Sequence, residues 1–314
     1  MLNIGIIGCG KIAQRFMKGA LELEDVKVIA CAARELDRAE QFARKYEIES
    51  AYGSYDEMLE CNDLDAIYIA TPPFMHEEHI RSCLNHNKHV LCEKPFVKNS
   101  DTVHSLFKLA QEKSLVLMEA NKTIFTPTWL SIRDALQKGL IGDVRYLEGS
   151  YTYRFPTTDH WVFDPMRMGG GMMDVGVYPL TVALSLAGLN VKEMKKMVMF
   201  NNQGSDDLTH MLLKFENGIM ASIKGGIGFD TDNHFTIYGD LGKIRVPRFS
   251  KNPYYFLEVY GDEEETIKLK FDSEFKFEIE HFAQCIQDGL CESPWMSEAM
   301  SAKIIELITT EEIE

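Results

Sequence analysis

Short apolar runs alternate with amphipathic stretches through the first third of this 314-residue chain. The runs have the length of buried strands, and the stretches between them have the 3.6-residue spacing of helices. The expected strands are 2–7, 26–32, 48–52, 66–70, 89–92 and 115–119, and the expected helices are about 11–23, 37–46, 54–60, 77–85 and 101–113, the last with Ser100 or Asp101 as its N-cap. Strands separated by helices predict a parallel sheet with right-handed crossovers. We therefore expect an α/β domain.

After about residue 121 the pattern changes to the two-residue alternation of half-buried strands. The expected strands are 143–155, 193–201, 208–215, 218–226, 233–238, 256–260 and 265–270, and the expected helices are 127–138, 171–187, 275–288 and 297–308. Asn217-Gly218 is a strong hairpin signal. We predict two domains, residues 1–121 and an α+β domain of residues 122–314 with a large open mixed or antiparallel sheet. The C-terminal helix is expected to pack back on the first domain.

Composition narrows the class of protein. Apolar residues make up 45% of the chain and charged residues 26%, as in ordinary globular proteins. A net charge of -15 argues against non-specific nucleic-acid binding, which needs a basic surface. No stretch approaches the ~20 apolar residues of a membrane helix, and no leader is evident. We expect a cytoplasmic protein with no membrane or nucleic-acid partner.

Cysteine and histidine spacing gives no indication of a metal site. The seven cysteines are scattered without a Cys-x-x-Cys pair, which suits reduced thiols. His76-Glu77-Glu78-His79 is one residue short of the His-Glu-x-x-His spacing, and no third ligand is evident. We predict no bound metal.

The most informative motif is Gly8-Cys9-Gly10-Lys11-Ile12-Ala13, a G-x-G-x-x-A pattern directly after a strand and at the start of a helix. Gly8 permits the tight turn, Gly10 lets a pyrophosphate approach the backbone, and Ala13 lets the helix pack close to the strand. The phosphates then lie at the helix N-terminus, where free N–H groups favour negative charge. This context predicts a Rossmann dinucleotide-binding domain, with Lys11 and Ile12 also in the cofactor site.

The end of the second strand indicates which dinucleotide binds. An NAD site usually has an acidic residue there, which bonds the ribose 2′-hydroxyl. Here Ala33 and Arg34 follow the strand, and an arginine can pair with a 2′-phosphate and stack on adenine. Glu35 is the counter-argument, because it reaches the ribose if the strand ends later. We therefore favour NADP, with NAD as the alternative.

Glu93-Lys94-Pro95 lies at the carboxyl end of an expected parallel strand, where open α/β sheets bind ligands. A lysine beside a nicotinamide can hydrogen-bond a substrate hydroxyl and help to move its proton. The alternative is a surface lysine at a turn. Position alone does not separate the two.

The third motif begins with Gly169-Gly170-Gly171 and contains Asp174 and Tyr178. The last two residues are four apart, so they share one face of the expected helix. A carboxylate beside a phenol can act as an orienting and proton-relay pair. In addition, a neighbouring ammonium group can lower the pKa of a tyrosine toward the working range of a general acid or base. The alternative is a helix-terminal aspartate and a tyrosine packed in the core.

In this order and at these spacings, the three motifs resemble those of the Gfo/Idh/MocA family of nicotinamide-dependent oxidoreductases, over nearly the whole chain. Thr71, Pro72 and His76 also fit the family pattern after the fourth strand. The resemblance implies that Lys94 is the catalytic lysine, Asp174 the helix aspartate, and Glu93 part of the cofactor site. Tyr178 falls where many members have histidine. A tyrosine at this position resembles the branch of dimeric dihydrodiol dehydrogenase, D-xylose dehydrogenase and glucose–fructose oxidoreductase.

The resemblance implies hydride transfer between the nicotinamide and a hydroxyl or carbonyl of a sugar, polyol or cyclic diol. It also implies a homodimer or homotetramer formed through the C-terminal sheet. His160 and Trp161, just before the glycine run, are candidates for a substrate loop, or for a plain surface loop. Two other functions stay open: a cofactor-binding regulator without chemistry, and an oxidoreductase that keeps its cofactor bound while shuttling hydride between two sugars.

Overall fold

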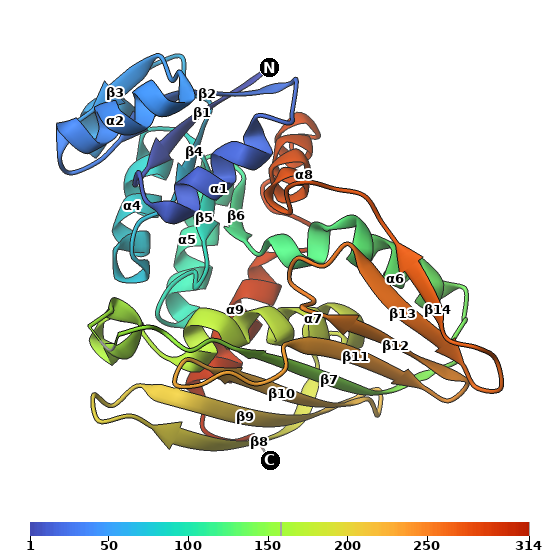
Figure 1. Ribbon diagram of the computed structural model, residues 1–314. Helices are drawn as coiled ribbons and strands as arrows, with labels where there is room; N and C mark the ends of the chain where they lie inside the picture. Colours follow the sequence, from blue (N-terminus) through green and yellow to red (C-terminus); the bar gives the residue numbers. More distant parts are fainter. Residues whose placement is uncertain (158, 314) are drawn as a thin grey trace. The chain divides into compact units, whose positions relative to one another are not determined.

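The computed structural model describes residues 1–157 and 159–313, and its contacts divide the chain into two units. The first unit contains residues 1–122 together with 273–302, and the second contains 123–272 together with the chain from Lys303 onward (Figure 1). The second unit is thus interrupted, whereas the sequence predicted the continuous range 122–314. The interruption is a helical segment that belongs with the first unit.

The first unit is built on a parallel six-stranded sheet of order β3-β2-β1-β4-β5-β6. Its strands are β1 (Leu2–Ile7), β2 (Val26–Ala32), β3 (Ser50–Tyr52), β4 (Ala66–Ile69), β5 (His89–Glu93) and β6 (Leu117–Ala120). Its helices are α1 (Lys11–Ala20), α2 (Leu36–Tyr46), α3 (Tyr55–Leu59), α4 (His76–Asn85), α5 (Ser100–Glu112) and α8 (Phe275–Gln287). The strand order reverses direction between β1 and β4, which is where such sheets bind ligands.

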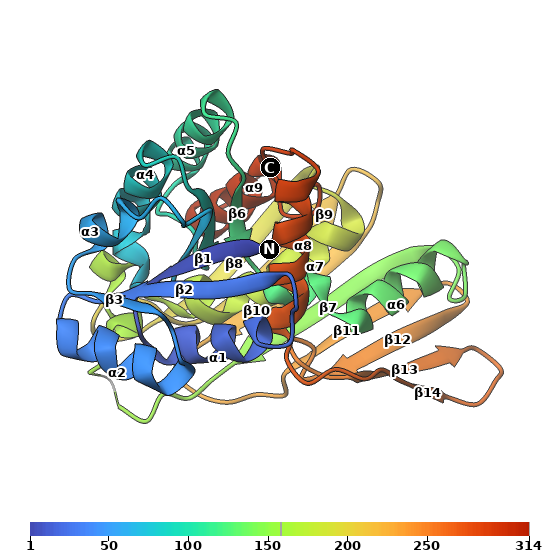
Figure 2. The same cartoon turned by 90° about the horizontal axis from the view of Figure 1, so that it is seen from above.

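Both faces of this sheet are covered, which explains why its strands are continuously apolar (Figure 2). On one face, side chains of β4 and β5 pack against α3, α4 and α5 in a cluster that includes Ile69, Val90, Ile80 and Leu106. On the other face, Phe16 of α1 stacks on Tyr68 with ring centroids 3.8 Å apart.

Helix α8 lies against α1 although about 250 residues separate them in the chain. Arg15 of α1 pairs with Glu274, and its guanidinium lies over the ring of Phe275, 5.0 Å from the ring centroid. Segments near the two ends of the sequence therefore share one core.

The second unit is built on an eight-stranded mixed sheet of order β14-β13-β12-β11-β7-β10-β9-β8. Its strands are β7 (Val144–Thr152), β8 (Val191–Phe200), β9 (Asp206–Phe215), β10 (Met220–Gly226), β11 (His234–Gly239), β12 (Gly242–Pro247), β13 (Tyr254–Val259) and β14 (Glu265–Lys268). Strands β7 and β10 run parallel, and the other pairs are antiparallel. The expected large mixed sheet is thus present, and the Asn217-Gly218 turn joins β9 to β10.

One face of this sheet packs against helices, and the other carries exposed apolar side chains. On the packed face, Trp129 of α6 (Pro127–Gln137) lies edge-on to Phe235, and α7 (Val177–Ala187) is almost wholly buried. On the opposite face, the strand register aligns a group that we call the open face: Met197, Met199, Leu212, Met220, Tyr146 and Tyr238. Met197 is 80% exposed. The last helix, α9 (Glu298–Thr309), crosses the boundary between the two units.

Three local expectations were wrong. The N-cap of α5 is Asn99, whose side chain accepts from the Thr102 N–H, rather than Ser100 or Asp101. Strand β12 was not expected, because Gly242 and Pro247 at its two ends have the composition of turns. Residues 165–187 do form a helical stretch long and apolar enough to cross a membrane, although 78% of its most apolar window is buried within the fold. A buried core helix meets the same criteria of length and composition.

Candidate active site

The turn between β1 and α1 has the geometry that a dinucleotide phosphate needs. Gly8 has φ +98°, and an added Cβ would lie 2.8 Å from the Ala70 carbonyl oxygen, so only glycine fits there. At Gly10, the N-cap of α1, an added Cβ would meet nothing within 4 Å, and no side chain caps the helix. No side chain caps the start of α1, so its first N–H groups are available to an anion.

The other residues predicted in this turn separate into buried and exposed positions. Ala13 is fully buried and allows α1 to pack closely on the sheet. Lys11 is exposed at the helix start, where its ammonium adds positive charge, and Ile12 is partly buried. The turn thus combines a buried residue that packs on the sheet with an exposed, positively charged residue at the start of α1.

Two arginines flank the end of β2. Ala33 is buried and donates its N–H to the Tyr52 carbonyl at 3.1 Å, while Arg34 is exposed. Burial raises the pKa of the Tyr55 phenol, and the guanidinium groups of Arg34 and Arg38 both act in the opposite direction, so both lie near that phenol. Arg38 was missing from the sequence prediction. Its spacing of four residues from Arg34, at the start of a helix, was the available signal.

Arg38 also lies near the phosphate-binding turn. Contact with the Cys31 thiol is the main cause that lowers the pKa of Cys9, and the charge of Arg38 lowers it further. A cavity of about 360 Å³ opens next to this region, with Arg34, Tyr55 and His79 among its lining residues. This part of the first unit has room and positive charge for the adenosine end of a dinucleotide.

The turns after β4 and β5 are tied together by His76. Its Nε2 lies 2.9 Å from the Thr71 carbonyl, and its Nδ1 lies 3.0 Å from the Pro95 carbonyl and 3.1 Å from that of Phe96. His76 is fully buried, so its observed contacts are those of an anchor between turns. Its predicted contact with a cofactor stays a prediction.

Thr71 is held by a second histidine. Its hydroxyl lies 2.9 Å from His79 Nδ1, and burial lowers the pKa of His79 to about 4. His79 is therefore neutral at ordinary pH and its hydrogen bond to Thr71 persists. Pro72, the next residue, is partly buried at the same edge of the sheet.

Glu93 and Lys94 lie at the carboxyl end of β5, as the sequence predicted for this motif. Glu93 is buried and accepts a 2.5 Å hydrogen bond from the Tyr68 hydroxyl. Lys94 follows at once, is partly buried, and is joined to Pro95 by a cis peptide bond. The strand order places this lysine next to the crevice between β1 and β4, at the edge where the phosphate turn also lies.

In the second unit, Asp174 and Tyr178 occupy consecutive helical turns of different kinds. Asp174 lies in a π-helical turn, Met172–Gly176, and Tyr178 lies in the first turn of α7. The predicted continuous helix is thus a π turn followed by an α-helix, a feature frequent at functional sites. Tyr178 is buried, and its ring lies 5.6 Å from that of Tyr151.

Close backbone packing holds this π turn on the sheet. An added Cβ at Gly225 of β10 would lie 2.5 Å from the Gly176 Cα. From β9, the Asp206 carboxylate accepts the Met172 N–H at 2.8 Å and the Thr209 hydroxyl at 2.7 Å. The sheet therefore fixes where Asp174 and Tyr178 stand within the second unit.

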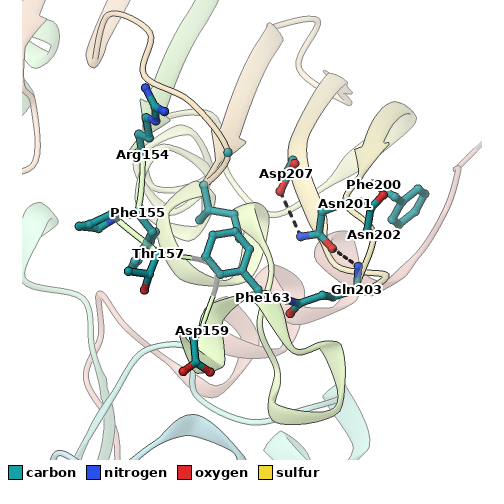
Figure 3. A pocket seen from close by; sticks show the side chains of 13 residues that line it. Arg154, Phe155, Thr157, Asp159, Phe163, Phe200, Asn201, Asn202, Gln203 and Asp207 are labelled. Carbon is teal, nitrogen blue, oxygen red and sulfur yellow. Dashed lines mark hydrogen bonds between the residues drawn. The ribbon is translucent and has the colours of Figure 1, made fainter.

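His160 and Trp161 lie in the loop after β7. The His160 ring lies between those of Phe155 and Trp161, and both predicted residues line a cavity of about 420 Å³. A larger cavity of about 970 Å³ adjoins it (Figure 3). In Figure 3 the Asn201 amide bridges to Asp207, near the rings of Phe163 and Phe200.

No group of three or more histidine, cysteine, aspartate or glutamate side chains suited to a metal ion occurs among residues 1–157 and 159–313. The chemistry available at the described sites is that of phosphate-binding backbone, guanidinium groups, an ammonium group, a carboxylate and a phenol.

A parallel sheet with an uncapped helix start after a tight glycine turn is the architecture of a dinucleotide-binding domain. Residues 2–121 match the model of the "Oxidoreductase family, NAD-binding Rossmann fold", and residues 129–245 match the "GFO/IDH/MocA C-terminal domain". The chain belongs to the Gfo/Idh/MocA family of oxidoreductases. The resemblance stated from the motifs is confirmed.

The chain is similar to named enzymes over nearly its full length. It is 31% identical to trans-1,2-dihydrobenzene-1,2-diol dehydrogenase of Xenopus laevis, covering 96% of this chain and 94% of that protein. It is 29% identical to dTDP-3,4-didehydro-2,6-dideoxy-alpha-D-glucose 3-reductase of Actinomadura kijaniata, covering 98% and 95%. The solved 3-ketoreductase KijD10 from the same organism, in complex with NADP and TDP-benzene, superimposes with a TM-score of 0.89 at 26% identity, covering 98% and 97%.

Substituting Gly225 tests whether the packing of the π turn positions Asp174 and Tyr178. We expect Gly225→Ala to lower turnover about 100-fold. The added methyl group would lie 2.5 Å from the Gly176 Cα, which is too close, so the π turn that carries Asp174 would have to move away from β10. Binding of NADPH, followed by its fluorescence, is expected to stay unchanged. Lys224→Ala, next to it but with its side chain on the other face, is the matched control; equal turnover in the two variants contradicts this account.

Proposed function

We propose that this protein is an NADP-preferring dehydrogenase or reductase that acts on a hydroxyl–carbonyl pair in a sugar, polyol or cyclic diol. The observation that carries the proposal is the position of Lys94 directly after β5, in a chain that matches the family across both domains. The similar dihydrodiol dehydrogenase and sugar 3-reductase act on substrates of these kinds, as their names state.

The backbone of the Gly8–Ala13 turn fits the dinucleotide, because α1 begins uncapped and faces open space at Gly10. When bound, the nicotinamide carries the hydride. In the proposed mechanism Lys94 hydrogen-bonds the substrate oxygen as an ammonium, Tyr178 exchanges the proton with that oxygen, and Asp174 orients them. The reverse assignment, with Lys94 as proton donor, uses the same residues.

Two guanidinium groups support the preference for NADP. Arg34 and Arg38 both act on the Tyr55 phenol, so together they offer a paired cationic site at the end of β2. A 2′-phosphate carries charge that such a pair neutralises, whereas the NAD ribose needs a hydrogen-bond acceptor there. The NADP complex of the similar 3-ketoreductase agrees with this choice.

The second unit supplies groups that suit a neutral hydroxylated substrate. Phe155, Phe163 and Phe200 offer apolar ring surface in the larger cavity, and Asn202 and Asp207 offer polar atoms beside it. Sugars and diols combine apolar C–H surface with hydroxyl groups, which such a mixed lining binds well. We include His160 and Trp161 in this substrate region.

The open face supports assembly with a second copy of the chain. An exposed apolar sheet face rimmed by polar residues is typical of an interface. We therefore propose a homodimer or homotetramer formed through the open face. We also propose that the protein is cytoplasmic.

Substitution of the proposed acid–base pair tests the mechanism. We expect Lys94→Ala and Tyr178→Phe each to lower kcat roughly 100-fold, the scale of general acid–base catalysis. The assay follows NADP+ reduction with a panel of aldoses, polyols and trans-dihydrodiols. Lys98→Ala and Tyr153→Phe, at exposed positions nearby, serve as controls.

Near-normal turnover in both variants contradicts the mechanism. NADP binding without turnover on any substrate of the panel favours a regulator instead. Cofactor that copurifies with the protein and exchanges slowly favours hydride shuttling between two sugars.

Charge removal at the end of β2 tests cofactor choice. We expect Arg34→Ala and Arg38→Ala each to raise the KM for NADP+ about tenfold or more, since each removes a charge-assisted hydrogen bond. The KM for NAD+ is expected to change little, because NAD+ lacks the 2′-phosphate. Arg44→Ala on the same helix is the control. Equal or better use of NAD+ by the unaltered protein overturns the preference.

Charged substitutions on the open face test assembly. We expect Met197→Asp combined with Leu212→Asp to convert a dimer or tetramer into a monomer, because buried carboxylates without partners oppose association. Sedimentation velocity measures the change, and Leu21→Asp, an exposed apolar position in the first unit, is the control. A monomeric unaltered protein, or a variant that still assembles, removes this part of the proposal.

A further inference from the structure

Glu119 is a buried carboxyl whose place in the fold the proposed chemistry does not yet explain. It lies on β6 and is 1% exposed. Its Oε2 accepts a 2.7 Å hydrogen bond from the Ser301 hydroxyl of α9, within the same unit. No hydrogen bond of ordinary geometry reaches its Oε1 from the residues that the structure describes. Such a carboxyl is expensive to bury in ionised form unless a cation compensates it.

The pairing of β5 with β6 indicates that this cation is Lys94. Cys92 of β5 pairs with Glu119 of β6, so the two side chains share one face of the sheet. Lys94 follows Cys92 by two residues, immediately beyond the end of β5. Glu93, between them, belongs to the opposite face, where it accepts from the Tyr68 hydroxyl. Glu119 and Lys94 are thus adjacent at the carboxyl edge of neighbouring strands.

The electrostatics of Glu119 agree with this placement. Burial raises the pKa of Glu119 to about 7. The Ser301 hydrogen bond lowers it, the Glu93 charge raises it, and the Lys94 ammonium and the Phe96 main-chain N–H both lower it. The charged groups acting on Glu119 are therefore Glu93 and Lys94, while α9 contributes only a neutral hydroxyl. Cys92 is buried, and that burial raises the pKa of its thiol, so the thiol carries no charge.

The group packed behind Lys94 from α4 is neutral as well. His76 holds the carbonyls of Pro95 and Phe96, and burial lowers its pKa below the ordinary value. A neutral imidazole adds no charge at the two carbonyls that it contacts.

We propose that the Glu119 carboxylate is a positioning residue that keeps Lys94 in its ammonium form and so sets the pH range over which Lys94 can act. Interaction between two titrating groups is reciprocal: the amount by which the Lys94 charge favours ionised Glu119 equals the amount by which ionised Glu119 favours charged Lys94. The significance for catalysis rests on the proposed role of Lys94. The coupling itself does not depend on that role.

The test titrates Lys94 directly in the cofactor-free protein. Competitive labelling with acetic anhydride across alkaline pH, read by mass spectrometry, gives the midpoint at which the Lys94 amine becomes reactive. We expect Glu119→Gln to lower this midpoint by about one pH unit, the smaller end of the effect of an opposite charge nearby. Glu119→Asp retains the charge and is expected to restore much of the shift.

Glu278→Gln is the matched control. Glu278 is also a fully buried carboxyl of the first unit, but the charges acting on it are Glu93, Lys122, Glu274 and Arg15. We expect it to leave the Lys94 midpoint unchanged. The same midpoint in Glu119→Gln as in the unaltered protein overturns the proposal.

A reciprocal measurement keeps the proposal testable if Glu119→Gln fails to fold. The infrared carbonyl band of protonated Glu119, assigned by its shift in Ser301→Ala, is followed against pH. We expect the band to persist to higher pH in Lys94→Met than in the unaltered protein, since the ammonium that favours ionisation is gone. Identical titrations overturn the proposal. Because neither measurement uses turnover, loss of the proposed enzymatic function and loss of this coupling are distinguished.

Discussion

The close approach of Gly8 to the main chain of Ala70 is the contact on which the first unit depends. It brings the end of β1 against the end of β4 at the point where the strand order reverses. A side chain at residue 8 would force these strand ends apart, and the positive φ there would add strain. With the contact in place, α1 begins without a cap, and its first N–H groups are left for an anionic ligand.

The same edge of the sheet concentrates buried polar groups. His76 ties the turn after β4 to the turn after β5, Glu93 binds the Tyr68 hydroxyl, and Glu119 is held by Ser301. Each of these groups is costly to bury, and each is compensated by a hydrogen bond or a neighbouring charge. The fold thus gathers buried polar groups with defined partners at the edge of the sheet where Lys94 lies.

Much of the fold could be predicted from the sequence, because the spacing of apolar residues and the positions of turn-forming residues are local signals. The apolar run of β1, the glycine turn and the parallel β–α alternation predicted the first domain, and the lysine after β5 followed from strand position. Strand β12 was missed because its terminal Gly242 and Pro247 outweighed a short alternation. The π turn at Asp174 was missed because it depends on packing against Gly225 and Asp206, far along the chain. Long-range partners such as Ser301 for Glu119 leave no local pattern at all.

The central claim is that the βα turn at Gly8 holds a nicotinamide dinucleotide, and a direct titration tests it. Adding the protein to NADPH and following nucleotide fluorescence should show saturable one-to-one binding. Gly10→Asp, which brings a carboxylate to the open start of α1, should abolish that binding while leaving the circular dichroism spectrum unchanged. Absence of saturable binding by the unaltered protein, or undiminished binding by Gly10→Asp, would contradict the account.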